Sequence, residues 1–305
     1  MLDVKLLSFI ALCQLKSFTA AAAQLNVTQP AVTQHIKALE AYYGTPLIRE
    51  KRKNFALTEQ GEILYRTLLT INTDLLKLEE QLRGAPGTTR TLSFGATLTI
   101  GEFVMPGIIA ELLDIYPKLQ IRQIVDNTKI LLEKLESGDL EFVAVEGFFD
   151  KIRYGHALFS HEPFIAVCSG HSDLVGKTVT LTDLIDRRFI VRERGSGTRD
   201  ILEQVLYQNG FLLSRLDNIT VVSNMNAIKL LVAANKGISF MYRAAARDRL
   251  ESGELCEIRV KDFHITREFN FVYMKNSLHA HRYARWFDEI RKIRTQLNMN
   301  KSQTH

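Results

Sequence analysis

A regular aliphatic seam constrains the fold of this chain most strongly. Its positions lie alternately four and three residues apart, which is the heptad pattern of one long helix with a single apolar stripe. The intervening residues are largely polar, so the stripe favours a partner helix, and packing onto the chain's own domain is the alternative. The predicted dimerisation residues are Leu64, Leu68, Ile71, Leu75, Leu78 and Leu82.

The residues before this helix are typical of a helix-turn-helix. Ser17 and Thr28 are both favourable N-cap residues, and Pro30 suits the first turn of the helix that follows Thr28. This second helix is predicted over residues 29–43, and Gly44 ends it. Two short helices joined by a tight turn, with a polar face on the second, form the pattern that places a helix in a DNA groove.

A short basic stretch follows the second helix. Residues 49–53 read Arg-Glu-Lys-Arg-Lys, whereas the net charge of the whole chain is only +5. Short strand patterns over residues 45–49 and 55–58 flank this stretch, which predicts a wing. A basic tip of this kind would contact phosphates, and a solvated loop is the alternative that charge alone leaves open.

From residue 90 the pattern changes to alternating strands and helices, which predicts an α/β fold with largely parallel sheets. The remaining stretch is long for one sheet, so two lobes are expected. Lobe 1 is predicted over residues 90–161 and 267–298, and lobe 2 over residues 162–266. The predicted strands are residues 92–96, 119–125, 142–146, 164–169, 189–192, 219–223, 238–242, 255–260 and 269–274.

These patterns divide the chain into three predicted parts. Residues 1–58 form a winged helix-turn-helix domain, and residues 59–89 form a linker helix that ends in a hinge at residues 84–89. Residues 90–305 form the two-lobed α/β region. The predicted fold class is therefore α/β with an all-α winged helix-turn-helix N-terminal domain.

Composition and missing motifs exclude several classes of protein. Hydrophobic residues make up 46% and charged residues 24% of the chain, which is ordinary for a soluble globular protein. Cys13, Cys168 and Cys256 are too far apart in sequence for a disulfide framework or a zinc pattern, and the start lacks a leader, so a cytoplasmic protein without metal is expected. No apolar run suits a membrane span, and no nucleophile elbow, Walker loop or H-E-x-x-H motif indicates an enzyme.

The chain resembles the LysR-type transcriptional regulators. The likeness rests on residues 17–22, 25–33, 39–40, 44–48 and 57–61, and more loosely on Tyr116-Pro117, Gly138-Asp139-Leu140, residues 195–199 and Gly237-Ile238. Three positions depart from the family pattern: Ala20 replaces a frequent Arg, Glu141 replaces the commoner Asp, and Tyr242 lies near a frequent Pro. The departures at Glu141 and Tyr242 weaken any direct transfer of effector contacts.

The resemblance implies that residues 90–305 form an effector-binding domain like the two-lobed periplasmic solute-binding proteins. It also implies paired N-terminal domains on an interrupted palindrome upstream of a target gene. A small-molecule coinducer would bind between the lobes, with no other cofactor. Homotetramers built as dimers of dimers are usual in the family.

The second helix of the N-terminal domain would carry most of the DNA contacts. A Gln amide can pair with adenine and a Thr methyl can touch a thymine methyl, so Gln29, Thr33 and Gln34 are the predicted base readers. Pro30 and Ala31 are small enough to let the helix sit deep. Simple solvation of these side chains is the alternative. The predicted phosphate contacts are Thr28, Lys37, Lys51, Arg52 and Lys53.

The effector site is expected where strands of the α/β region end and helices begin. Hydroxyls and free helix N–H groups at such points suit a small anion, and ordinary N-caps and turns are the alternative reading. Glu146 and Gly147, at the end of the third strand, would instead read an amine or a hydroxyl. The other candidate residues are Thr97, Leu98, Thr99, Thr128, Gly195, Ser196, Gly197, Thr198, Arg199, Ser223 and Asn224.

The sequence therefore predicts a cytoplasmic transcriptional regulator rather than an enzyme. Its expected partners are double-stranded promoter DNA, a second copy through the linker helix, a small anionic metabolite and, as a further candidate, RNA polymerase. A solute-binding protein, a ligand-independent architectural DNA binder and an α/β enzyme remain the alternatives. Closure of the lobes on the ligand would change how the dimers pack in the tetramer, and so the spacing of the paired DNA-binding heads. The ligand would thereby shift the population of tetramers from one arrangement to another.

Overall fold

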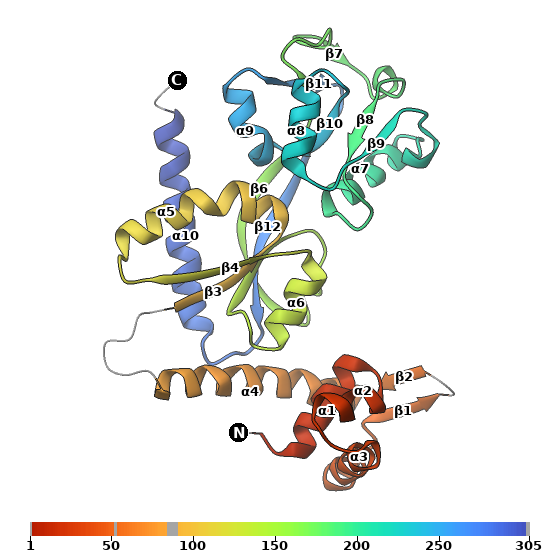
Figure 1. The fold of residues 1–305 in the computed structure, drawn as a ribbon, viewed down its shortest axis with the longest axis vertical. Helices are drawn as coiled ribbons and strands as arrows, with labels where there is room; N and C mark the ends of the chain where they lie inside the picture. The colour runs from red at the N-terminus through yellow and green to blue at the C-terminus, as the bar shows by residue number, and fades with distance from the viewer. Residues whose placement is uncertain (1, 52–53, 84–90, 303–305) are drawn as a thin grey trace.

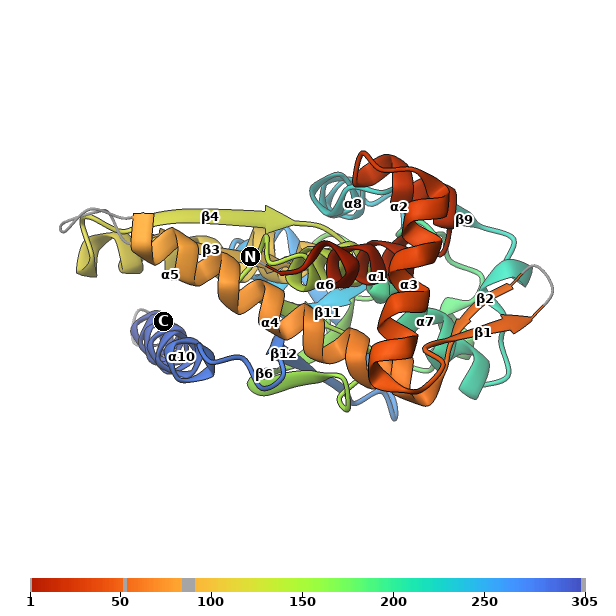
Figure 2. The same ribbon diagram turned by 90° about the horizontal axis from the view of Figure 1, so that it is seen from below.

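The computed structural model describes residues 2–51, 54–83 and 91–302. Figure 1 shows a small helical head at one end, a long helix (α4) that leaves it, and two α/β lobes stacked beyond that helix. In Figure 2, seen from below, α4 runs under the nearer lobe with the head at its N-terminal end. The predicted wing-tip residues Arg52 and Lys53, and the predicted hinge at residues 84–89, lie outside the described residues.

The head is a helix-turn-helix with a two-stranded wing. It consists of α1 (Val4–Leu15), α2 (Phe18–Gln24), α3 (Gln29–Tyr43), β1 (Ile48–Lys51) and the antiparallel β2 (Asn54–Leu57). The Ser17 hydroxyl accepts the backbone N–H of Ala20 and caps α2. Phe9, Leu12 and Val32 are fully buried between the helices. The helix boundaries that the caps predicted are thus present.

Glu40 and Gly61 hold the wing against the helices. Oε1 of Glu40, near the end of α3, accepts the backbone N–H of Leu47 at 2.8 Å and that of Ile48 at 3.3 Å. A Cβ on Gly61 would lie 2.1 Å from the carbonyl oxygen of Leu47, so only glycine fits at this approach. The wing and α4 therefore take defined positions relative to α3.

Lobe 1 is built around parallel strands with helices on their faces. β3 pairs in parallel with both β4 and β5, so the carboxyl ends of β3 and β5 lie side by side. The C-terminal helix α10 (Ala280–Ser302) packs against α5 and the long strands. The other elements are β3 (Thr91–Ala96), the π-helix η1 (Ile100–Val104), α5 (Met105–Ile115), β4 (Gln120–Val125), α6 (Thr128–Glu136) and β5 (Phe142–Glu146).

Lobe 2 contains a small parallel sheet and strands that extend the main sheet. β8 pairs in parallel with β9, whereas β10 and β11 both pair with β6. Its elements are β7 (Thr178–Val179), η2 (Thr182–Leu184), β8 (Phe189–Val191), α7 (Gly197–Gln208), η3 (Leu213–Arg215), β9 (Ile219–Val221), α8 (Met225–Ala233), β10 (Ser239–Tyr242), α9 (Arg243–Glu251) and β11 (Leu255–Val260).

Two long strands connect the lobes. β6 (Tyr154–Ser169) and β12 (Ile265–Met274) pair antiparallel along most of their length. The main sheet has the order β4-β3-β5-β12-β6-β11-β7, with β10 also on β6, and it is mixed. The expectation of largely parallel sheets is therefore wrong for this sheet, because the chain crosses between the lobes twice in opposite directions. The first part of β6 was also missed, since its alternation of polar and apolar residues is interrupted.

Helix α4 (Glu59–Arg83) is shared between the head and lobe 1. Leu68 is only 4% exposed and belongs to a core cluster that contains Phe9 of the head and Leu135 of α6. The carboxylate of Asp74 accepts the Ser277 hydroxyl at 2.6 Å and the Leu278 backbone N–H at 2.9 Å. The helix that carries the head is thus bonded to the segment between β12 and α10.

We expect Asp74→Ala to loosen this attachment of α4. The substitution leaves the buried Ser277 hydroxyl and the part-buried Leu278 N–H without their acceptor, which should lower the free energy of unfolding by about 1–3 kcal/mol. Urea denaturation followed by circular dichroism measures the loss. Asp114→Ala on α5 is the matched control, because Asp114 is exposed and its removal should change stability by less than about 0.5 kcal/mol. Equal effects of the two substitutions would contradict the assigned role of Asp74.

Candidate functional site

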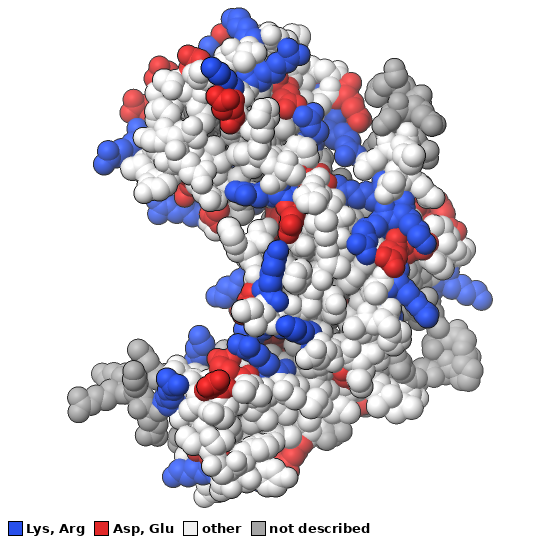
Figure 3. All heavy atoms as spheres, turned by 180° about the vertical axis from the view of Figure 1, so that it is seen from behind, with Lys and Arg blue, Asp and Glu red and all other residues white. Residues whose placement is uncertain are grey.

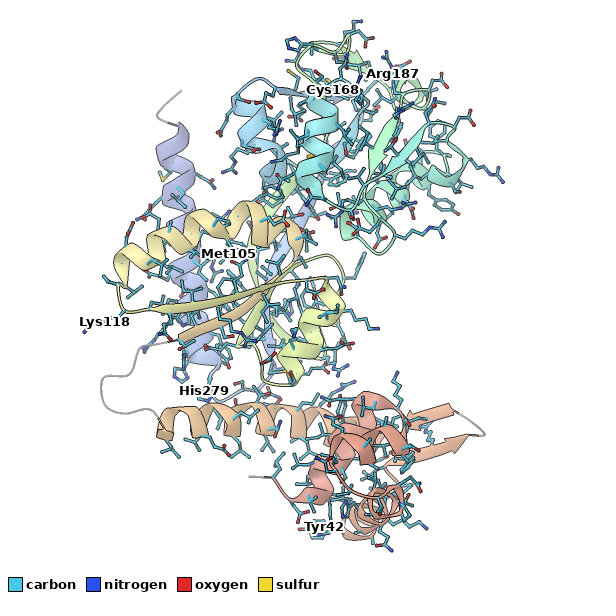
Figure 4. The ribbon with its side chains drawn as sticks, viewed as in Figure 1. Tyr42, Met105, Lys118, Cys168, Arg187 and His279 are labelled. Carbon is cyan, nitrogen blue, oxygen red and sulfur yellow. The ribbon has the colours of Figure 1, made fainter. Side chains whose placement is uncertain are left out.

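Helix α3 turns a polar face away from the head. Val32, Ile36 and Leu39 are buried in the head, whereas Gln34 and Lys37 are exposed. Tyr42, labelled in Figure 4, lies at the far end of the same helix. A helix with an apolar inner face and an exposed polar outer face, beside a wing, is suited to the major groove of DNA.

The first turn of α3 is organised by its own side chains. The Thr28 hydroxyl accepts the Ala31 N–H at 3.3 Å and caps the helix. Nε2 of Gln29 donates to Oγ1 of Thr33 at 3.1 Å, and the Thr33 hydroxyl donates to the Gln29 carbonyl at 3.2 Å. Among the residues described, none hydrogen-bonds the side chain of Gln34. Gln34 is therefore the predicted base reader that needs least rearrangement to contact a base.

The structure describes the remaining predicted DNA contacts to different extents. Pro30 is exposed at the start of α3 and Ala31 is half-buried beside it. Lys51 belongs to the backbone of β1, but its side chain is not among those described, and Arg52 and Lys53 lie outside the described residues. The contact of these wing residues with phosphates stays a prediction.

A largely apolar groove of about 670 Å³ lies between part of α4 and lobe 1. Ile71, Leu75 and Leu78 line it from α4, and Ile152 and Leu278 from lobe 1. Figure 4 labels His279, which lines the same groove where lobe 1 faces α4. Leu78 is 46% and Leu82 is 76% exposed, so this end of the predicted dimerisation seam is open.

The seam therefore divides into two halves with different environments. Leu68 is packed inside its own chain, and Leu64 packs partly against the same core. Leu68 is therefore unavailable to a partner helix while it fills that core, Leu64 is half-buried, and the exposed part of the predicted seam begins at Ile71. Dimerisation through this seam stays a prediction. The periodicity could not show this, because both packing arrangements require the same apolar spacing.

A buried polar cluster lies where the strands of lobe 1 end. The Thr99 hydroxyl donates to Oε1 of Glu146 at 3.2 Å, and both residues are buried. Oγ1 of Thr97 and Oε2 of Glu146 have no hydrogen-bond partner within the described parts of the chain. An unpaired buried polar atom costs about 1–3 kcal/mol, so such atoms are uncommon unless a ligand or water pairs with them.

The surroundings of Glu146 disfavour its charged form. The pKa of Glu146 is raised to about 7, mainly by burial. The Glu162 carboxylate also raises this pKa, whereas the Thr99 hydrogen bond and the Arg192 guanidinium lower it. The folded-state pKa thus exceeds the ordinary value of 4.5. The protonated Glu146 therefore contributes stability that is fully present below pH 4.5 and is lost as the pH rises through about 7.

Lobe 2 contributes two side chains that the sequence reasoning missed. Tyr242 ends β10, is 1% exposed, and its hydroxyl has no partner among the described residues. Burial and the Glu146 charge both raise the pKa of Tyr242. The Tyr242 ring packs on that of Phe269 with their centroids 4.9 Å apart, and Phe269 is the partner of Glu146 in the pairing of β12 with β5. Arg192 follows β8 and is 5% exposed, with Nε and Nη2 on Glu193. Each ends a predicted strand, which is the signal that could have identified them.

The glycine loop before α7 lies beside this cluster. The buried Arg199 donates from Nη1 to the Arg192 carbonyl at 3.0 Å and from Nε to Glu203 at 2.7 Å, so its guanidinium is not a free fork for an oxyanion. The loop has Gly195 at φ +87° and exposed, Gly197 half-buried, and Ser196 and Thr198 buried. Ser196 makes no side-chain cap bond to α7.

The other predicted effector residues are more ordinary. Asn224 caps α8 through the Ala227 N–H at 2.9 Å, and Ser223 beside it is exposed. Asn127 rather than Thr128 caps α6, by accepting the Ile130 N–H at 3.0 Å. Leu98 is half-buried, and Gly147 is exposed at φ +99°. The structure thus brings Thr97, Thr99 and Glu146 together and gives Asn224 a capping role.

Two searches of the described residues were negative. No helix among residues 2–51, 54–83 and 91–302 has the length and hydropathy of a membrane span. The same ranges contain no group of three or more His, Cys, Asp or Glu side chains suited to a metal ion. Figure 3 shows that one face is indented between the outer lobe and the head, with Lys and Arg along the indentation.

Comparison with protein families gives two matches that together span most of the chain. A model described as "Bacterial regulatory helix-turn-helix protein, lysR family" matches residues 4–62. A model described as "LysR substrate binding domain" matches residues 85–293. The first match covers the head and the start of α4, and the second covers both lobes.

Curated relatives and solved structures agree with these matches. The regulator CysL of Bacillus subtilis is 28% identical over 87% of this chain and 89% of its own length, and CbbR of Rhodospirillum rubrum is 30% identical over 89% of each. The Corynebacterium glutamicum OxyR C206 mutant superposes with a TM-score of 0.62 at 21% identity, covering 99% of this chain and 94% of that one. The regulatory domain of Synechocystis CcmR, in complex with 2-PG, has a TM-score of 0.56 at 20% identity, covering 65% of this chain and 95% of that one.

Proposed function

Because this chain belongs to the LysR family of DNA-binding transcriptional regulators, we propose that it acts on promoter DNA as a cytoplasmic, non-enzymatic homo-oligomer controlled by a small molecule. The observation that carries this proposal is the exposed polar face of α3 above a fully packed head. A regulator must reach the chromosome, which supports the cytoplasm as its location. RNA polymerase is the proposed downstream partner.

The open half of α4 supports a dimer. Ile71, Leu78 and Leu82 are 42%, 46% and 76% exposed, and they line or extend the groove beside lobe 1. A second copy of α4 has the complementary heptad stripe, so its apolar residues would fill this surface. Two such dimers would form the homotetramer that the family resemblance implies.

The junction between the lobes is the proposed effector site. In lobe 1, Thr99 is hydrogen-bonded to Glu146 and Thr97 follows the end of β3; in lobe 2, the Tyr242 ring packs on Phe269, the strand partner of Glu146. A ligand that bound Thr97, Thr99, Glu146 and Tyr242 together would favour one arrangement of the lobes. That arrangement would reach the DNA-binding heads through α4, which is bonded to lobe 1 at Asp74. The CcmR structure with 2-PG supports a small anion as the ligand class.

A footprinting experiment tests the proposal. Full-length protein should protect an interrupted palindrome upstream of a target gene, and an effector found by a thermal-shift screen of small anions should change the length of the footprint. Because coupling is reciprocal, operator DNA should change the affinity for that effector by the same factor. Protection that no small molecule alters would instead favour an architectural DNA binder. Turnover of a metabolite without DNA would favour an enzyme.

A further inference from the structure

Buried polar atoms from both lobes lack a partner at the lobe junction. They are Oγ1 of Thr97, Oε2 of Glu146 and Oη of Tyr242, and no described residue hydrogen-bonds them. The side chains are 5%, 7% and 1% exposed. Thr97 and Glu146 lie at the carboxyl ends of the neighbouring strands β3 and β5, and Tyr242 ends β10 in the other lobe. Unpaired buried atoms at the ends of two neighbouring strands and of a strand of the other lobe indicate a position for a bound polar group.

The chemical character of these atoms restricts what can bind. The hydroxyls of Thr97 and Tyr242 can each donate a hydrogen bond, and a protonated Glu146 adds a third donor. An ionised Glu146 would instead repel a negative group and attract an ammonium group. The protonation state of one side chain therefore selects between an anionic and a cationic ligand.

The groups that face Glu146 favour the protonated form. Thr99 contacts it from the start of η1, Glu162 acts on it from β6 and Tyr242 lies near it from β10. Arg192 is the cation that acts on it, and two of the nitrogens of that guanidinium are bonded to Glu193. The Glu162 carboxylate repels a charged Glu146, and the Arg192 guanidinium that would stabilise that charge is also bonded to Glu193. When an anion is added, Glu146 is therefore expected to be protonated and neutral.

We propose that the lobe junction binds a small molecule bearing an oxyanion, and that Glu146 takes up a proton when it binds and donates a hydrogen bond to that oxyanion. Thr97 and Tyr242 supply the other donors. The inference rests on the proposed function, because it specifies the ligand class and the pH regulation of the same site. No bond other than hydrogen bonds forms, and the proton comes from solvent.

Proton uptake fixes the sign of the pH dependence. Burial raises the pKa of Glu146 to about 7 before any ligand is present, and an adjacent anion raises this pKa further. Above about pH 7 the site must gain a proton to bind, so the affinity should fall about tenfold per pH unit. Below about pH 6 the acid is already protonated and the affinity should be constant.

Inorganic sulfate is the probe, because its charge is constant over this pH range. Binding of sulfate to the full-length protein is measured by isothermal titration calorimetry from about pH 6 to about pH 8.5, at constant ionic strength in chloride. Repeating the titration in buffers with different ionisation enthalpies counts the protons. We expect uptake that approaches one proton per sulfate at the alkaline end.

Variants separate this role from a structural one. Glu146→Gln keeps a donor in place of the acid, so it should bind sulfate at all pH values about as tightly as the wild type does at about pH 6. Tyr242→Phe and Thr97→Val should each weaken binding without changing its pH dependence. Glu136→Gln is the matched control, since Glu136 is another buried carboxyl with a raised pKa, near Arg153 and away from the junction. It should retain the wild-type profile.

Several results would overturn the inference. They are wild-type affinity that does not change with pH, affinity that increases with pH, a Glu146→Gln protein with the wild-type profile, and no sulfate binding at any pH. If Glu146→Gln does not fold, the proton count on the wild type decides alone. A band-shift assay with promoter DNA on the same preparation keeps the two proposals apart. Loss of DNA binding contradicts the proposed function, whereas intact DNA binding with pH-independent sulfate binding contradicts only this inference.

Discussion

A full-length protein that carries Leu78→Asp is expected to be monomeric and to lose most of its affinity for promoter DNA. Leu78 lies at the centre of the open half of α4, between Ile71 and Leu82, and is 46% exposed. In a dimer the aspartate would enter the apolar seam without a partner charge, which opposes association. Loss of the second head removes an avidity gain of about 100- to 10,000-fold.

Light scattering coupled to size exclusion measures the mass, and a band-shift assay measures the affinity. Leu212→Asp is the matched control, because Leu212 is 42% exposed between α7 and η3 in the outer lobe. It should leave both the mass and the affinity unchanged. A Leu78→Asp protein that remains dimeric at micromolar concentration would show that α4 does not hold the copies together. Circular dichroism confirms that the variant is folded.

The second large effect is expected on sequence preference. Gln34→Ala removes an exposed amide that no described residue holds, and a bidentate contact with a base contributes about 1–3 kcal/mol of discrimination. The variant should therefore tolerate several bases at one operator position, where the wild type prefers one. Competition binding with a library of single-base operator variants measures this change.

Lys37→Ala provides the contrast for Gln34→Ala. Lys37 is exposed on the same helix, and its expected partner is a phosphate. Its removal should weaken binding to all sequences alike and reduce the slope of log affinity against log salt by about 1. If Gln34→Ala lost the same factor on specific and random DNA, its role as a base reader would be ruled out.

The head shows which structural features local sequence signals can predict. Ser17 and Thr28 cap their helices as the sequence indicates, and Gly44 ends α3 at φ +65°. Capping and apolar spacing act within one or two turns, so they can be read without knowing the rest of the fold. The heptad seam shows the limit, since its first part packs inside the chain and its later part stays open.

The lobe junction depends on contacts that no local pattern contains. Thr97, Thr99 and Glu146 could be proposed because each follows a predicted strand, but Tyr242 could not be joined to them. Their meeting requires β6 and β12 to cross between the lobes antiparallel, and this crossing also makes the main sheet mixed. Residue spacing does not encode which strands become neighbours.

Residue patterns alone predict the helix-turn-helix, its polar face, the long amphipathic helix and the α/β character of the rest, because each of these features depends on interactions over a few residues. Which half of α4 is exposed to a partner depends instead on how the folded chain packs around that helix. The same packing brings the Glu146 carboxyl of one lobe and the Tyr242 phenol of the other to the lobe junction, each with an oxygen that no described residue hydrogen-bonds. Burial and proximity between distant segments are properties of the packed chain, and they set both the accessibility of a leucine and the pKa of a glutamate.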